Sequence, residues 1–314
     1  MAADARSAAP SDETAIVPVF ESVPEVAERL SETGYLPDAA TATATYLADR
    51  LGKPLLVEGP AGVGKTELAK AIAAATGAEL VRLQCYEGLD EARALYEWNH
   101  AKQILHIQST GSREWDETKA DIFSDEFLLP RPLLKAISRT EPTVLLIDEV
   151  DKADVDMEGL LLEVLSDFAV SIPEMGTVRA VRRPIVILTS NAARELSEAL
   201  KRRCLYLHID FPDAGREKEI LASRVPDLPD ALAAEVVRVI GALRGLDIRK
   251  KPSVSETIDW GNTLLALSGG AAAGTPEANL AKGRIDDSLI SRTLGVVLKH
   301  RPDLATARKE LKLD

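Results

Sequence analysis

The feature that most constrains this chain is the octapeptide GPAGVGKT at residues 59–66. It matches the pattern G-x-x-x-x-G-K-[ST] at every fixed position, and it lies between a short apolar run and an alanine-rich stretch. The pattern predicts a glycine-rich turn from a strand into a helix, in which backbone N–H groups point at phosphate oxygens. We therefore predict a site for a nucleoside triphosphate. A strand–helix turn without a ligand is the alternative.

Each residue of this loop has an expected part in binding. Lys65 is expected to reach the β- and γ-phosphates, and the hydroxyl of Thr66 is expected to bind Mg²⁺. The other loop residues supply the backbone that encloses the phosphates. The predicted nucleotide-binding set in this segment is Gly59, Pro60, Ala61, Gly62, Val63, Gly64, Lys65, Thr66 and Glu67.

A second motif, VLLIDEVD at residues 144–151, is a hydrophobic strand that ends in adjacent carboxylates. We expect Asp148 to bind the nucleotide's Mg²⁺ through its water shell, together with Thr66. Glu149 is placed one residue further on, where it can polarise an attacking water. Solvated acidic residues at a strand end are the alternative. A phosphate loop, however, requires a metal ligand from a neighbouring strand.

Two further motifs complete the predicted site. The sequence ILTSN puts Asn191 at the carboxyl end of another apolar strand, where its amide can hydrogen-bond the γ-phosphate or orient the water. The sequence LKRRC puts Arg202 and Arg203 at the amino end of the next strand, far from their own phosphate loop. They can instead reach the γ-phosphate of a neighbouring subunit, which predicts a ring. A solvated basic helix end is the alternative.

Apolar runs of strand length alternate with helical stretches over the first two thirds of the chain, which predicts a doubly wound parallel α/β layer. The runs are 54–58, 79–84, 143–149, 184–190 and 205–211, and the helical stretches are 65–76, 132–139, 156–168 and 193–201. A long insert at 86–128 and a hairpin at 169–183 interrupt this alternation.

Only helices are expected after Pro212. The predicted organisation is a flexible tail at 1–20, a nucleotide-binding core at 21–213, a helical lid at 214–267, and a linker with a C-terminal helical tail at 268–314.

Charge and composition exclude several functions. Fifty acidic and 38 basic side chains give a net charge of −12, which repels nucleic-acid backbones and anionic membranes. The two cysteines cannot form a disulfide framework, and the N-terminal residues lack the apolar core of a signal peptide. No apolar stretch reaches the length of about 18 residues that a membrane span needs. We expect a cytoplasmic protein that binds no membrane, and the charge disfavours a nucleic acid as its partner.

Together these motifs resemble the AAA+ ATPases. The resemblance covers residues 20–265, and in four segments the chain is similar to the MoxR-type ATPases, especially the branch that accompanies carbon-monoxide-dehydrogenase-like molybdenum hydroxylases. The resemblance implies a P-loop NTPase core with a five-stranded parallel sheet in the order 5-1-4-3-2, followed by a small all-helical lid. It also implies hydrolysis of ATP, with Mg²⁺, to ADP and phosphate. The four segments are 124–137, 147–154, 161–180 and 188–213.

The resemblance also implies partners. MoxR-type proteins are chaperone-like motors that activate metalloenzyme clients, work as homo-oligomeric rings that we expect to be hexamers, and commonly have a partner with a von Willebrand factor A domain. By the family pattern, Arg203 is the better candidate for the arginine that acts in trans, and Arg202 is second. Many AAA+ proteins also carry a sensor arginine early in a lid helix. Here the presumed helix contains no arginine, so either Arg249, Lys250 or Lys251 substitutes for it from the start of the helix, or the role is absent.

Two rival functions remain open at this point. A DNA-remodelling AAA+ ATPase would share the core motifs, although the net charge opposes it. A small-molecule kinase also uses a phosphate loop, but it has little need of an Asp-Glu pair with arginines from a neighbour. A GTPase is a weaker alternative, because the sequence has no Asn-Lys-x-Asp motif for reading guanine.

Overall fold

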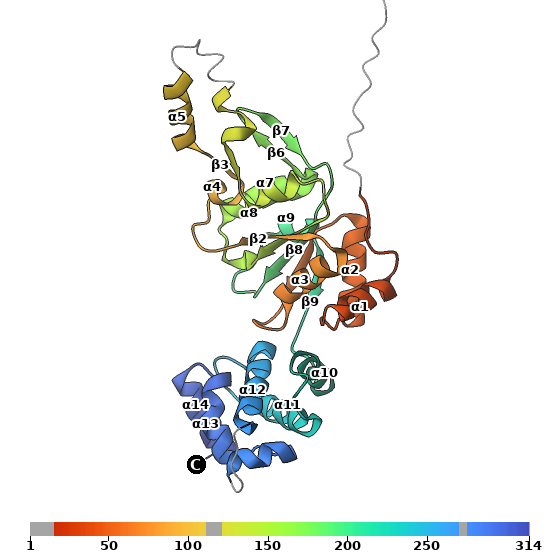
Figure 1. The fold of residues 1–314 in the computed structure, drawn as a ribbon, viewed down its shortest axis with the longest axis vertical. Coiled ribbons are helices and arrows are strands. Elements are labelled where there is room, and N and C mark those ends of the chain that lie inside the picture. The colour runs from red at the N-terminus through yellow and green to blue at the C-terminus, as the bar shows by residue number, and fades with distance from the viewer. Residues whose placement is uncertain (1–15, 111–120, 270–274, 314) are drawn as a thin grey trace, which may run out of the picture.

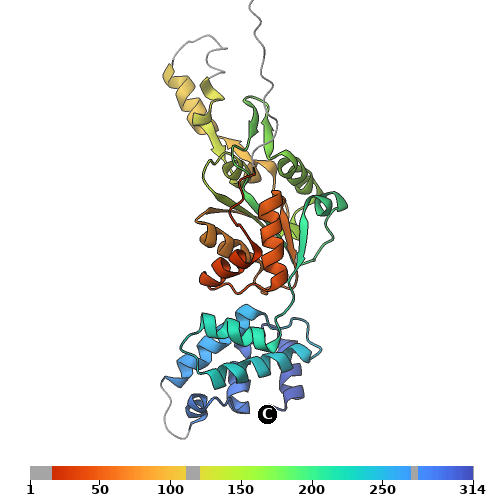
Figure 2. The same cartoon turned by 90° about the vertical axis from the view of Figure 1, so that its right-hand side faces the viewer.

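The computed structural model describes residues 16–110, 121–269 and 275–313. Figures 1 and 2 show two lobes: a sheet covered by helices, and a helical lobe that follows it in the chain. The chain passes from the first lobe to the second after β9 (Leu205–His208). In the described ranges, no helix combines the length and the apolar character that a membrane span needs.

A five-stranded parallel sheet forms the centre of the first lobe. Its spatial order is β2-β5-β8-β1-β9, and every neighbouring pair runs parallel. If these five strands are numbered 1 to 5 along the chain and the sheet is read from β9 to β2, the order is 5-1-4-3-2. The predicted topology is therefore confirmed. The remaining strands are β1 (Leu55–Glu58), β2 (Glu79–Gln84), β5 (Thr143–Asp148) and β8 (Ile185–Ser190).

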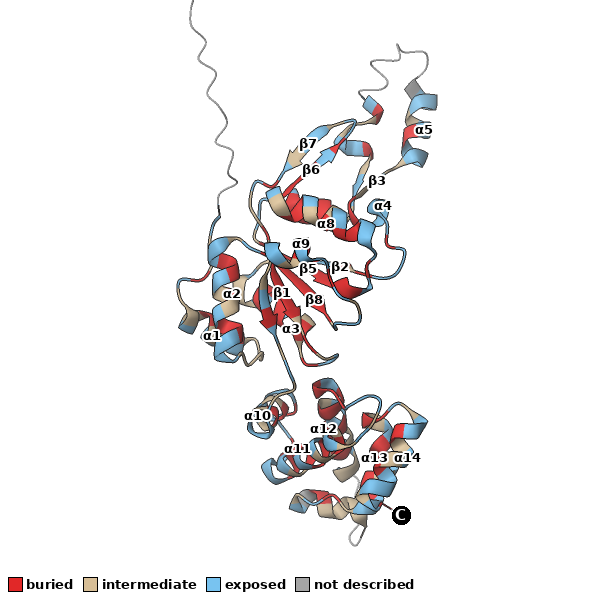
Figure 3. Cartoon of the chain, turned by 180° about the vertical axis from the view of Figure 1, so that it is seen from behind, coloured by how far each residue is buried: buried red, intermediate tan, exposed pale blue. Residues whose placement is uncertain are grey.

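Successive side chains of the central strands point to opposite faces of the sheet, as strand geometry requires. In β5, Val144 and Leu146 join one hydrophobic cluster, whereas Leu145 and Ile147 join the other. Figure 3 shows these buried strands between helical layers. The first cluster includes residues of α1 (Val23–Glu32), α2 (Ala39–Leu51) and α3 (Lys65–Thr76), and the second includes residues of α7 (Pro132–Ile137), α8 (Val155–Asp167) and α9 (Glu198–Arg203).

Two additions extend this lobe beyond the sheet. The insert contains β3 paired antiparallel with β4, and the predicted hairpin is confirmed as β6 paired antiparallel with β7. The insert elements are α4 (Glu91–Ala94), β3 (Tyr96–Trp98), α5 (His100–Thr110), the 3-10 turn η1 (Asp125–Phe127) and β4 (Leu128–Pro130); the hairpin strands are β6 (Ala169–Ile172) and β7 (Gly176–Arg179).

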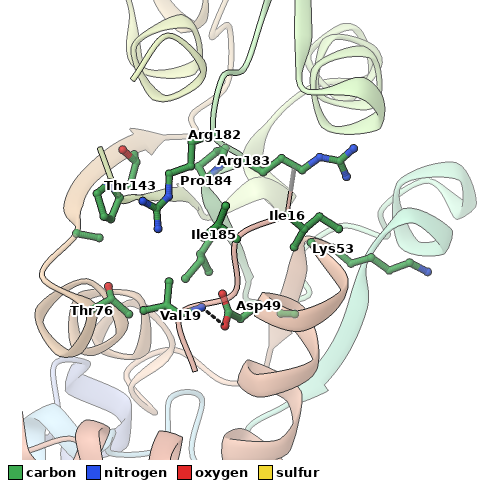
Figure 4. Close-up of a pocket in the computed structure, with 15 residues that line it drawn as sticks. Ile16, Val19, Asp49, Lys53, Thr76, Thr143, Arg182, Arg183, Pro184 and Ile185 are labelled. Carbon is green, nitrogen blue, oxygen red and sulfur yellow. Dashed lines mark hydrogen bonds between the residues drawn. The ribbon is translucent and has the colours of Figure 1, made fainter. Parts of the chain in front are cut away.

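A short N-terminal segment, residues 16–20, packs at the amino edge of the sheet. The backbone N–H groups of Val19 and Phe20 donate to Oδ2 of Asp49, at 2.8 and 2.9 Å, and the Phe20 side chain is buried. Figure 4 shows the Val19–Asp49 hydrogen bond beside a cavity of about 20 Å³, which has room for one water. Of the predicted tail, residues 1–15 lie outside the described residues.

The second lobe is built from helices around one hydrophobic cluster that includes the fully buried Trp260. Residues on both sides of residue 268 contribute to this cluster, so the C-terminal helices share a core with the predicted lid. The domain boundaries at residues 20, 213 and 267 stay predictions. The helices are α10 (Ala214–Arg224), α11 (Asp230–Gly245), α12 (Val254–Ser268), η3 (Pro276–Lys282), α13 (Asp287–Val297) and α14 (Arg301–Leu311).

A buried ion pair ties α10, α11 and α12 together. Arg244 donates from both terminal nitrogens to the carboxylate of Glu217, at 2.6 and 2.7 Å. The hydroxyl of Thr257 donates to the same carboxylate at 2.7 Å, and Nε of Arg244 donates to the Pro252 carbonyl at 2.8 Å. The side chains of Glu217 and Arg244 are only 3% and 11% exposed, so the two charges depend on each other for solvation.

We expect Glu217→Ala to lower the free energy of unfolding of the helical lobe by about 3–5 kcal/mol, because it leaves the charge of Arg244 buried without its partner. Urea unfolding followed by Trp260 fluorescence measures this change, in a background that carries Trp98→Phe and Trp115→Phe.

The matched control is Glu219→Ala on the same helix. Glu219 is 64% exposed and pairs with the partly exposed Arg216 at 3.0 Å, so its loss should cost less than about 1 kcal/mol. Equal losses of stability from the two variants would contradict the claim that the buried pair of Glu217 and Arg244 stabilises the helical lobe more than an exposed pair does.

Candidate active site

The glycine-rich loop, residues 59–66, connects β1 to α3 at the carboxyl edge of the sheet. Gly59 has a φ of +154° and Gly62 a φ of +76°. A Cβ on Gly59 would lie 1.9 Å from the carbonyl oxygen of Ile209, and one on Gly62 would lie 2.4 Å from Cβ of Ser253. Space and backbone conformation both require glycine at these two positions.

The other loop residues divide between packing and exposure. Val63 is buried, Pro60 is half-buried and Ala61 is exposed. Glu67 follows in the first turn of α3, where its carboxylate pairs with Lys70 at 2.6 Å and faces Arg224 of α10 at 3.5 Å. Glu67 therefore contacts the helical lobe.

Lys65 begins α3, and its ammonium group lies inside the loop. Its Nζ donates to the backbone oxygens of Gly59 and Pro60, at 2.7 and 2.6 Å, and to Oδ1 of Asn191 at 2.9 Å. Burial lowers the pKa of this ammonium group, although nearby carboxylates oppose the shift. The structure thus brings Lys65 and Asn191 together, at a buried position that favours an anionic ligand.

Asp148 lies at the end of β5, and its residue exposure is only 2%. The hydroxyls of Thr66 and Thr189 donate to its Oδ1, at 2.9 and 2.5 Å. The guanidinium of Arg82 lies 2.5 Å from Oδ2 of Asp148, so this carboxylate forms an ion pair with an arginine. A carboxylate next to a threonine hydroxyl provides the hard oxygen ligands that Mg²⁺ prefers. Thr66 and Asp148 therefore fit the predicted metal.

Glu149 has a left-handed backbone, with φ of 56° and ψ of 48°. A non-glycine residue in this region costs on the order of 1 kcal/mol, and such strain is concentrated at functional sites. Its Oε2 accepts hydrogen bonds from Gln84 at 2.8 Å and from Lys152 at 2.6 Å, and its N–H donates to Thr189 at 2.9 Å. These contacts fix the direction in which the carboxylate leaves the strand.

The sequence motifs did not indicate four further contacts of the two carboxylates, which are Arg82, Gln84, Lys152 and Thr189. Gln84 is the last residue of β2 and lies opposite Asp148 in the register of β2 and β5. A polar residue at the carboxyl end of a strand was therefore the available signal, since that edge carries the other site residues.

The segment between Asn191 and α9 differs from the predicted structure. The helix predicted at 193–201 is wrong over its first residues, because α9 begins at Glu198 with Ser197 as its N-cap. The backbone N–H of Ala193 donates to Asp151 at 2.9 Å, and that of Ser197 donates to Glu158 at 2.9 Å. These buried carboxylates bind the N–H groups of the segment and hold it out of a helix.

Arg202 and Arg203 end α9 and are exposed. Because β9 pairs in parallel with β1, the amino end of β9 lies at the edge opposite the phosphate loop. Nε of Arg203 donates to Oγ of Ser166 on α8 at 2.7 Å. The structure does not bring these arginines to the chain's own loop, in agreement with their predicted position.

A cavity of about 530 Å³ lies between the lobes beside the loop, and its volume suits a drug-sized ligand such as a nucleoside. Its lining includes Gly62 and Glu67, Tyr35, and residues of α10 and α12. The N–H of Val254, the first residue of α12, donates to the Gly62 carbonyl at 3.2 Å. The helical lobe therefore contacts the phosphate loop directly.

The candidate sensor residues of the lid do not line this cavity. Arg249 and Lys250 donate their backbone N–H groups to Asp303, at 3.0 and 3.2 Å. Within the described part of the chain, the cavity wall contains none of residues 249–251, whereas Arg216 of α10 belongs to it. Nη2 of Arg216 is buried and finds no hydrogen-bond partner among the described residues.

Neither cysteine adds a reactive thiol to the site. Burial raises the pKa of Cys85 and of Cys204 to about 12, so neither thiol is a thiolate near neutral pH.

Three relatives illustrate the similarity to known proteins. An uncharacterised protein of Staphylococcus haemolyticus is 24% identical over 229 residues, which are 69% of this chain and 78% of that protein. Protein NorQ of Paracoccus denitrificans is 25% identical over 219 residues, which are 68% of this chain and 72% of NorQ. Chaperone protein ClpB 2 of Parasynechococcus marenigrum is 35% identical over 138 residues, which are 43% of this chain but only 13% of ClpB 2.

A family model described as an AAA domain of the dynein-related subfamily matches residues 54–204. This stretch contains the phosphate loop, both carboxylates at the end of β5, Asn191 and both arginines of α9. The predicted fold class is confirmed: the chain has the AAA+ P-loop NTPase fold.

Proposed function

We propose that this chain is a ring-forming ATPase that hydrolyses ATP to ADP and phosphate and uses the energy to remodel a protein client. One observation carries the proposal: phosphate-binding, metal-binding and water-activating side chains meet at one edge of the sheet, while exposed arginines lie at the opposite edge. The first group is Lys65, Thr66, Asp148, Glu149 and Asn191, and the second is Arg202 and Arg203.

The nucleotide would lie across the two lobes. Its phosphates would replace the backbone oxygens that Lys65 now contacts, and its base and ribose would occupy the cavity next to Tyr35. Thr66 and Asp148 would hold Mg²⁺, which when bound neutralises charge on the β- and γ-phosphates.

Glu149 would act as the base for hydrolysis. Its carboxylate takes a proton from water as the water oxygen attacks the γ-phosphorus, and the bond to the β-phosphate oxygen breaks. Asn191 accepts a hydrogen bond from Lys65, and from that position it would orient the attacking water or hydrogen-bond the γ-phosphate. Gln84 and Lys152 orient the Glu149 carboxylate through their hydrogen bonds to its Oε2.

The site would be completed by a second copy of the chain. No arginine of α9 lies near the chain's own loop, and transfer of the γ-phosphoryl group is strongly accelerated by an arginine supplied from a neighbour. Arg203 is the first candidate and Arg202 the second. A ring, which we propose to be a hexamer, gives each copy one neighbour on each side.

Two variants separate nucleotide binding from hydrolysis. Lys65→Ala should weaken ATP binding on the order of 100-fold, because it removes a charged donor from the phosphates. Glu149→Gln should leave binding intact and slow hydrolysis by about 10²–10⁴-fold, because the base is lost. Fluorescent-nucleotide titration and phosphate release measure the two effects. Lys70→Ala on the exposed side of the same helix is the control.

The trans arginine is tested by mixing subunits. Arg203→Ala should slow hydrolysis by about 10³–10⁵-fold with little effect on ATP affinity. Adding Glu149→Gln subunits, which are themselves inactive but retain Arg203, should restore part of the rate. If the mixture stays as inactive as its components while mixed rings form, Arg203 does not act in trans, and Arg202 is to be tested in the same way.

We propose a client of the molybdenum hydroxylase type and a partner with a von Willebrand factor A domain, in the cytoplasm. The MoxR-like segments of the sequence support this, and ClpB 2, which is similar to 43% of this chain, is named a chaperone protein. Neither the DNA-remodelling alternative nor the kinase alternative gains support from a specific contact.

Co-expression with a candidate molybdenum hydroxylase tests the client. The hydroxylase should gain activity with the unchanged chain and not with Glu149→Gln, since only the former completes hydrolysis. Equal activity with both variants would contradict this part of the proposal.

A further inference from the structure

The segment 192–197 joins two parts of the chain that would serve different active sites. It begins directly after Asn191, which contacts Lys65 of the chain's own site. It ends at α9, whose last residue is Arg203, and under the proposed function Arg202 and Arg203 would reach a neighbour's site. Whatever fixes this segment therefore controls where those arginines lie.

Glu158 of α8 is the main anchor of the segment. It is 2% exposed, and its Oε2 accepts the backbone N–H of Ser197 at 2.9 Å. Its Oε1 accepts a hydrogen bond from Nη2 of Arg194, which also donates to the Ala153 carbonyl at 2.7 Å. Burial opposes ionisation, yet the hydrogen bonds from Ser197 and the charge of Arg194 keep the pKa of Glu158 below its usual value.

Glu158 holds the residue from which α9 starts. Oγ of Ser197 accepts the N–H of Leu200 at 3.3 Å, so Ser197 is the N-cap of the helix. The Leu200 side chain is fully buried in the hydrophobic cluster that also contains Leu145 and Ile147 of β5. With only six residues, α9 has little internal stability, so its direction depends on what holds its two ends.

The same helix, α8, also contacts the far end of α9. Nε of Arg203 donates to Oγ of Ser166, which lies eight positions after Glu158 on α8. Glu158 fixes the start of α9, and Ser166 contacts its last residue. The exposed arginines are thereby carried on a short helix that α8 holds at two points.

We propose that Glu158 is a positioning residue for the arginine that this chain supplies to the next subunit. The inference rests on the proposed trans role of Arg203. Glu158 touches no part of its own chain's phosphate site, so its loss should damage the neighbour's hydrolysis and spare its own site. Glu158→Gln keeps the size of the side chain and one acceptor, but it removes the charge that holds Arg194.

The experiment uses rings mixed from two kinds of full-length subunit. Donors carry Glu149→Gln and retain Arg203, and acceptors carry Arg203→Ala and retain an intact site. Hydrolysis in the mixture then comes only from acceptor sites next to donors. Adding Glu158→Gln to the donors should lower the rate by about 10- to 100-fold, because a small misplacement of a catalytic group is costly.

The same substitution placed in the acceptors separates positioning from a general loss of structure. There it should change the rate by less than about twofold, because acceptors contribute no arginine. Glu163→Gln on the exposed face of α8 is the matched control in donors and should have no effect. ATP affinity of the donors, and ring size by sedimentation, should be unchanged.

The outcomes distinguish the inference from the proposed function. An equal loss in donors and acceptors, including a loss caused by failed assembly, would show that Glu158 only stabilises the fold and would overturn the inference alone. An unchanged rate with Glu158→Gln donors would also overturn it. No hydrolysis in the mixture that lacks any Glu158 change would instead refute the trans arginine, and the inference with it.

Discussion

The parallel pairing of β5, β8 and β1 is the constraint on which the rest of the structure depends. Parallel strands present their carboxyl ends at one edge, so Asp148, Asn191 and the phosphate loop leave the sheet side by side. The hydrogen bonds from Lys65 to Asn191, at 2.9 Å, and from Thr66 to Asp148, also at 2.9 Å, join all three strands. Reversing any one strand would take its residue out of the site. The same polarity sends the arginines of α9 to the opposite edge.

This arrangement buries charge, and the molecule offsets the cost locally. Lys65, Asp148 and Asp151 are each less than a tenth exposed. Lys65 and Asp148 each have several hydrogen-bond partners, whereas Asp151 accepts the N–H of Ala193 at Oδ2 and its buried Oδ1 has no partner among the described residues. Glu149 and Ala192, at the ends of two neighbouring strands, both have left-handed backbones with a φ of 56°. Strain and buried charge are thus concentrated where phosphate chemistry needs fixed polar groups, and the apolar clusters on both faces of the sheet hold them there.

The local sequence was sufficient for features with a short-range cause. The loop, the apolar strands and the hairpin depend on residues close in the chain, and the strand order came from the family resemblance. Individual contacts outside these motifs that depend on distant residues were not predicted. The late start of α9 depends on Glu158, 39 positions before Ser197, and the contact between Gly62 and Val254 joins the two lobes. The role of Gln84 requires knowing that β2 lies beside β5.

Under the proposed function, each active site is incomplete until a second copy of the chain supplies an arginine. The most direct measurement is the ATP hydrolysis rate per subunit over a wide range of protein concentration, compared with assembly state by sedimentation. The account predicts that the rate per subunit is very low for the monomer and rises with the same midpoint as ring formation. A full and concentration-independent rate from the monomer would contradict it.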